Sequence, residues 1–178
     1  MRRMTALIGA AAIVLWTVSA FAQAKANFAG TWVREAPAAP AGGAPPGGGG
    51  GGGRGGGGGG GGWGMECTIT QTASDLTVKW MQAGRGGGEA TPVERAYKLD
   101  GSESKNMVAG RGGAEATAVM SKATWDGGKL VIKTTTANGE QTLVVAIDGG
   151  NLTLVTTNPG RDGAPPTTGA PIDYKKKM

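Results

Sequence analysis

The stretch from Trp125 to Thr157 decides the fold, and it reads WDGGKLVIKTTTANGEQTLVVAIDGGNLTLVTT. Three runs rich in Leu, Val, Ile and Thr are separated by Asp-Gly-Gly at 126–128, Asn-Gly at 138–139 and Asp-Gly-Gly at 148–150. Asn-Gly and Asp-Gly adopt the positive φ angles of tight hairpin turns, whose twist matches that of the flanking strands. The stretch therefore predicts a meander of antiparallel strands.

The earlier chain follows the same rule. Leu76, Val78 and Trp80 alternate with polar residues and predict a strand with one buried face. Further strands are expected at 27–34, 65–72, 93–99, 104–108 and 117–125. A total of about eight or nine strands is the number at which an antiparallel sheet closes into an up-and-down β-barrel. The predicted fold is therefore an all-β barrel, with an open sandwich as the alternative.

Strand parity places the short turns together at one end of the barrel. These turns are expected at 73–75, 100–101, 126–128 and 148–150, whereas the opposite end carries the long connections and the Asn-Gly turn at 138–139. Two of the long connections are near-copies of each other, at 83–91 and 109–117. The sequence thus predicts an open, mobile end with a rim of three arginines, which are Arg54, Arg85 and Arg111.

Three segments are expected to lie outside the barrel. Residues 1–22 have the basic start, apolar run and small-residue end of a secretory signal, so export to the periplasm or beyond is expected. Residues 36–64 are a Gly/Pro insertion with few side chains to bury, and 158–178 are interpreted as a flexible basic tail. The barrel domain is therefore expected within 23–157, and the mature chain has no apolar run long enough to span a membrane.

The opening Asn-Phe-Ala-Gly-Thr-Trp at 27–32 resembles the Phe-x-Gly-Thr-Trp motif of calycins, the group of lipocalins and fatty-acid-binding proteins. The chain also resembles small exported bacterial proteins of unassigned function. The calycin resemblance implies an up-and-down barrel whose cavity holds a small apolar molecule. It implies structural roles for Gly30 and Trp32, with the tryptophan packed at the closed end.

The composition argues against catalysis. Histidine is absent, which removes the usual general base near neutral pH and imidazole as a metal ligand. Cys67 is the single cysteine and alternates onto the inward face of its strand, where a cysteine is usually an inert hydrophobe. The aspartates fall in turns and form no calcium-loop pattern. We therefore expect no enzyme activity, no metal and no cofactor.

The aromatic residues indicate the place of a ligand. Inward or end positions of strands, or the end of the glycine run, hold the candidate ligand-binding residues Trp80, Tyr97, Trp125 and Trp63. The leading hypothesis is a binding protein for a small, partly apolar ligand that enters at the open end. The alternative is a structural or interaction protein of the cell envelope, with a filled barrel and cationic loops that meet an anionic polymer or surface. Sparse Arg-Gly-Gly steps argue against a nucleic-acid partner.

Overall fold

The computed structural model describes residues 25–35, 62–84, 88–109, 115–160 and 164–178. Within these ranges the chain is all-β and contains no helix. Accordingly, none of the described residues forms a helix with the length and apolarity that crossing a membrane requires. The signal at 1–22, most of the Gly/Pro insertion at 36–64 and the three rim arginines lie outside the described residues.

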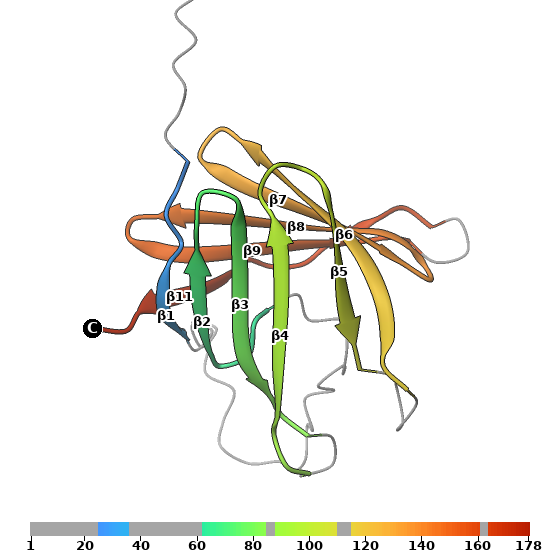
Figure 1. The fold of residues 1–178 in the computed structure, drawn as a ribbon, viewed down its shortest axis with the longest axis horizontal. Helices are drawn as coiled ribbons and strands as arrows, with labels where there is room; N and C mark the ends of the chain where they lie inside the picture. The colour runs from blue at the N-terminus through green and yellow to red at the C-terminus, as the bar shows by residue number, and fades with distance from the viewer. Residues whose placement is uncertain (1–24, 36–61, 85–87, 110–114, 161–163) are drawn as a thin grey trace, which may run out of the picture.

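Antiparallel strands form a single, nearly closed sheet (Figure 1). The strands are β1 (Gly30–Arg34), β2 (Glu66–Gln71), β3 (Asp75–Gln82), β4 (Thr91–Lys98), β5 (Glu103–Val108), β6 (Thr117–Asp126), β7 (Lys129–Thr136), β8 (Gly139–Asp148), β9 (Asn151–Asn158), β10 (Thr167–Thr168) and β11 (Ile172–Lys176). Their order is β4-β3-β2-β1-β11-β9-β8-β7-β6-β5, and the short β10 pairs with β9 beside this path. The predicted antiparallel barrel is confirmed in this architecture.

The meander at Trp125–Thr157 forms as its turn residues predict. Strands β6 to β9 pair in sequence, and the turn between β8 and β9 is made by Gly149 and Gly150 at φ angles of 56° and 86°. These angles lie in the left-handed region that glycine adopts without a Cβ clash. Because successive strands are antiparallel, four short turns gather at one end, which we call the closed end, whereas the long connections and the short β7–β8 turn lie at the other, the open end.

The C-terminal segment corrects two expectations. Residues 158–178 were expected to be a flexible tail, but β11 within them pairs with β1 on one side and with β9 on the other (Figure 1). Tyr174 in β11 is 0% exposed. The main path therefore has ten strands rather than eight or nine, and the barrel domain extends to Lys176. The Thr-Gly, Pro and Lys-rich composition concealed a strand in which only Tyr174 is a fully buried large side chain.

The sheet is interrupted at one place only along its path. Strands β4 and β5 are its two ends, and no ladder pairs them within the described residues. Instead, Ala96 N–H donates to Asn106 Oδ1 and Asn106 Nδ2 donates to Ala96 O, each at 2.9 Å. Lys98 N–H donates to Ser104 Oγ at 2.8 Å. We call this boundary the β4–β5 seam.

Alternation of side chains along every strand separates an inner from an outer face. In β3, for example, Leu76 and Val78 are 0% exposed, while Lys79 between Val78 and Trp80 points outward. The inner face of the barrel holds the apolar core, to which Trp32, Leu130, Val145 and Leu154 all contribute at 0–2% exposure. Burial of this apolar surface is the main stabilising contribution, at about 25 cal/mol per Å².

Candidate functional site

The closed end is filled by the segment before β1. Phe28 is 0% exposed and stacks on Trp125, with ring centroids 5.8 Å apart and the ring planes 5° from parallel. Gln71 holds this segment, because its Oε1 accepts from Phe28 N–H at 2.8 Å and its Nε2 donates to Ala26 O at 3.0 Å. Trp32 Nε1 donates to Phe28 O at 2.8 Å. Packed aromatic rings therefore fill the space that a ligand would need to enter the barrel at this end.

Glycine at position 30 lets the opening motif enter the sheet. Gly30 has a φ of 140°, and a Cβ there would lie 2.8 Å from Cε of Lys176. The ammonium group of Lys176 lies 5.6 Å from the centre of the Trp32 ring, a cation–π arrangement. Gly30 and Trp32 thus occupy the junction between β1 and β11.

The open half of the barrel is less tightly packed than the closed half. Inner residues near the closed end are mostly buried, with Trp125 and Ile147 as half-buried exceptions. Inner residues nearer the open end are half-buried in six strands, and they include Trp80, Val93, Val108, Val119, Leu143 and Ile172. Solvent therefore reaches the inner wall of the open half, where a ligand could replace it.

Polar side chains line part of this inner wall. Ser104, Ser121, Thr134 and Gln141 stand in register across β5, β6, β7 and β8. Ser121 and Thr134 share a hydrogen bond of 2.9 Å, and Gln141 Nε2 donates to Asn158 Oδ1 in β9 at 2.7 Å. Ser104 accepts from Lys98 N–H, so each of the four side chains has a hydrogen-bond partner in the protein.

Among the described residues, three buried polar side-chain atoms have no hydrogen-bond partner, and all three belong to inner residues: Trp125 Nε1 at the closed end, Arg95 Nε and Thr156 Oγ1. Arg95 Nε and Thr156 Oγ1 are inaccessible to solvent and make no hydrogen bond. Arg95 on β4 lies with its guanidinium carbon 5.7 Å from the centre of the Trp80 ring. Thr156 on β9 is 6% exposed and lies on the opposite side of the barrel, since four strands separate β4 from β9 in either direction. The barrel interior therefore lies between Arg95 and Thr156.

Tyr97 is next to Arg95 on the inner face. Burial raises the pKa of the Tyr97 phenol, and this effect is opposed by the positive charge and the hydrogen bond of Arg95. Tyr97 therefore stays protonated near neutral pH. It offers a neutral hydroxyl beside the guanidinium group.

The structure brings together only some of the predicted ligand-binding residues. Trp80 lies in the open half, and a Cβ at Gly64 would lie 2.9 Å from Trp80 Cδ1, so the segment that carries Trp63 runs beside it. Trp63 itself is 3% exposed, and its backbone N–H donates to the Tyr174 hydroxyl at 2.8 Å. Trp125, by contrast, stacks on Phe28 at the closed end, away from this group.

Sequence reasoning missed Arg95 and Thr156 as site residues. Alternation in the expected strand at 93–99 puts Arg95 on the same face as Val93 and Tyr97, where a charged residue argues against a buried strand rather than for a ligand site. Thr156 belongs to a run of Thr, Leu and Val in which threonine reads as an ordinary strand residue. The signal available in the sequence was the parity itself, which puts both residues inside.

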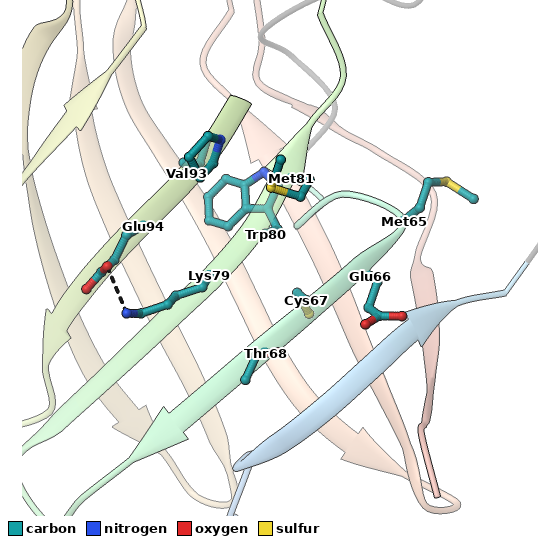
Figure 2. A pocket seen from close by; sticks show the side chains of 10 residues that line it. Met65, Glu66, Cys67, Thr68, Lys79, Trp80, Met81, Val93 and Glu94 are labelled. Atoms are coloured by element: carbon teal, nitrogen blue, oxygen red, sulfur yellow. Dashed lines mark ion pairs between the residues drawn. The ribbon is translucent and has the colours of Figure 1, made fainter. Parts of the chain in front are cut away.

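A hollow lies beside the part of the sheet nearest the open end, and the inward-facing residues Cys67, Trp80 and Val93 line it together with outward side chains. It has a volume of about 650 Å³ and is bordered by β2, β3 and β4. The outward side chains that line it include Met81, Pro92, Lys79 and Glu94, and Figure 2 shows the last two joined by their ion pair of 3.1 Å. Both charged side chains are more than half exposed, at 61% and 58%, so the pair contributes little stability.

Cys67 offers no reactive thiol. It is 1% exposed, and burial, followed by the neighbouring charge of Glu66, raises the pKa of its thiol to about 12. The thiolate is the nucleophilic form, so Cys67 is unreactive near neutral pH. Within the described ranges, no three Cys, Asp or Glu side chains gather as metal ligands would.

The chain is similar to solved structures of calycin-type barrels. One is the wild-type fluorescent protein UnaG, at 23% identity over 63% of this chain and 72% of that chain, with a TM-score of 0.44. Another is zebrafish ileal bile acid-binding protein complexed with cholic acid, at 20% identity over 63% of this chain and 72% of that chain, with a TM-score of 0.45. The sequence matches no protein-family model and no curated protein.

These structures are of the type that the opening motif predicts. The likeness concerns the fold alone. It says nothing of which molecule this chain binds.

Proposed function

We propose that this protein binds a small, partly apolar ligand inside the open half of its barrel. The observation that carries the proposal is that Arg95 Nε and Thr156 Oγ1, two buried atoms without partners, face a barrel interior whose apolar residues toward the open end are half-buried. A buried polar group without a hydrogen bond destabilises the folded state by about 1–3 kcal/mol. A ligand with polar groups at these two atoms would remove that destabilisation.

The wall also matches the apolar part of such a ligand. Trp80, Val93 and Leu143 present half-buried apolar surface on β3, β4 and β8. Covering that surface contributes about 25 cal/mol per Å². Arg95 supplies a positive charge, so acceptor groups, and anionic groups above all, fit its side of the lumen. The ligand class is therefore a small molecule with an apolar body and hydrogen-bond acceptors.

Filling the lumen tests this proposal. Leu143→Trp places a larger side chain on the inner face of β8, whereas Val144→Trp places the same side chain on the outer face one residue away. The probe is 1-anilinonaphthalene-8-sulfonate, which is small, apolar and anionic and fluoresces when it leaves water. We expect wild type and Val144→Trp to bind it alike, and Leu143→Trp to bind at least about tenfold more weakly.

Equal probe binding by all three proteins would contradict the proposal. Native mass spectrometry of the protein purified gently from its own source supplies an independent readout. A reproducible added mass that disappears on organic extraction supports a carried ligand. A bare protein mass together with no probe binding would favour the filled barrel.

Substitutions of the rim arginines distinguish the envelope hypothesis from ligand binding inside the barrel. Replacing Arg85 and Arg111 by alanine is expected to leave probe binding nearly unchanged, because the proposed site is formed by the strands. The same change would abolish attachment to an anionic polymer or surface if the loops were the functional part. We further propose that the chain acts after export, on the basis of the signal-like residues 1–22. Cleavage before Gln23, seen by mass spectrometry of the mature protein, tests this.

A further inference from the structure

The β4–β5 seam is held by side chains where the rest of the barrel is held by ladders. Asn106 accepts from Ala96 N–H and donates to Ala96 O, both at 2.9 Å. The side-chain amide has the same donor and acceptor pair as a peptide group, so it replaces one residue of the missing strand pairing. Ser104 Oγ adds one bond, from Lys98 N–H.

The seam is weaker than the boundaries on either side of it. The β3–β4 ladder joins eight residue pairs and the β5–β6 ladder joins six. At the seam, three hydrogen bonds made by the side chains of Asn106 and Ser104 take the place of such a ladder. Further toward the open end, Pro92 has no N–H to donate, and no described hydrogen bond joins Glu94 to β5. Rotation of two side chains is therefore enough to release this boundary.

The seam opens directly onto the proposed binding wall. Ala96, which Asn106 holds, lies between the inward-facing Arg95 and Tyr97. Val93 and Val108, the inner residues nearest the open end in β4 and β5, are half-buried. The partnerless Nε atom belongs to Arg95. Release of Ala96 would connect solvent with this part of the interior without disturbing the closed end.

We propose that the ligand enters and leaves the barrel through the β4–β5 seam and that Asn106 is the latch of this passage. The proposal rests on the proposed function, since it describes how the interior site is reached. If passage requires the seam to open, the association and dissociation rates both rise in proportion to the open population. The equilibrium affinity then stays nearly constant while both rates change.

Three variants separate the latch from the general effect of removing a hydrogen bond between strands. Asn106→Leu keeps a similar shape and removes both bonds to Ala96, and Ser104→Ala removes the single bond to Lys98. Thr153→Val is the matched control, because Thr153 faces outward on β9 and its hydroxyl donates to Asp173 Oδ1 of β11 at 2.7 Å, away from the inner wall. Stopped-flow fluorescence of 1-anilinonaphthalene-8-sulfonate measures both rates, and hydrogen exchange measures protection of the Ala96 and Lys98 amides.

For Asn106→Leu we expect both rates to rise roughly ten- to a hundredfold, with less than a threefold change in affinity. For Ser104→Ala we expect a smaller rise, roughly three- to tenfold, and for Thr153→Val no rise. Exchange at Ala96 should accelerate in Asn106→Leu by the same factor as the rates. If Asn106→Leu does not fold, the association and dissociation rates of the probe with Ser104→Ala test the proposal instead.

Rates for Asn106→Leu that match those of Thr153→Val would overturn the latch while leaving the binding function intact. A large loss of affinity with unchanged rates of association would also overturn it, because that result makes Asn106 part of the site. Absence of probe binding by the wild-type protein would overturn the proposed function, and the passage with it.

Discussion

The hydroxyl of Tyr174 ties the last strand to the segment before β2, and its removal gives a quantitative test of the corrected C-terminus. It accepts from Trp63 N–H at 2.8 Å and donates to Gly64 O at 3.0 Å. Tyr174→Phe keeps the ring and removes both bonds. A hydrogen bond contributes about 0.5–1.5 kcal/mol, and main-chain groups left without a partner in a buried site add to the loss. The expected destabilisation is about 2–3 kcal/mol.

Thermal denaturation followed by circular dichroism measures this effect. For a folded part of roughly 120 residues, a loss of 2–3 kcal/mol lowers the Tm by roughly 10 °C. Tyr97→Phe is the control, since it removes another buried phenol that is not bonded to the Trp63–Gly64 segment. A Tm for Tyr174→Phe within roughly 3 °C of wild type, or no lower than that of Tyr97→Phe, would refute the reasoning.

Alkaline titration provides a second readout of the same group. Burial raises the pKa of Tyr174 from 10.0 to about 12, while the hydrogen bond from Trp63 N–H opposes the rise. The folded state therefore holds this proton more tightly than the unfolded state. Its stabilising contribution is complete below pH 10 and is lost as the pH rises from 10 to about 12. Tyr174→Phe should lack this part of the alkaline loss.

Three further predictions concern the closed end, the thiol and the last strand. Gln71→Ala removes the bonds to Phe28 and Ala26 and should lower the free energy of unfolding by about 1–2 kcal/mol in urea, and an unchanged midpoint would contradict it. Cys67 should resist a thiol reagent at pH 8 until denaturant is added, and rapid labelling of the folded protein would show otherwise. Deleting 172–178 should abolish cooperative unfolding, unless β1 and β9 are stable as open edges.

The sequence predicts most of the strand arrangement because the turns between strands are specified by local residue pairs. Asp-Gly and Asn-Gly pairs adopt positive φ angles wherever they occur, so the meander at Trp125–Thr157 and the segregation of turns can be deduced without tertiary information. Even the weak strand at 104–108 was placed correctly, as β5. Its inward residues are polar because Ser104 and Asn106 bond to the backbone of β4, which no periodicity reveals.

The errors arise where a distant partner decides the conformation. β11 holds a single fully buried side chain, Tyr174, and exists because β1 and β9 flank it. The candidate site shows the same limit. Alternation indicates that Trp80 and Tyr97 face inward, but only the assembled barrel shows that Trp125 belongs to the closed end and that Arg95 and Thr156 lack partners.

The position of β11 between β1 and β9 also determines when the barrel can close. Trp32 pairs with Lys176, so this contact joins nearly the two ends of the described chain. Contacts of such long sequence separation form slowly, because the loop entropy is lost before the contact stabilises the fold. Until β11 has been synthesised and has paired, β1 and β9 are free edges of an open sheet. Closure therefore waits for β11, and the period before it is when the chain is most exposed to aggregation through these two edges.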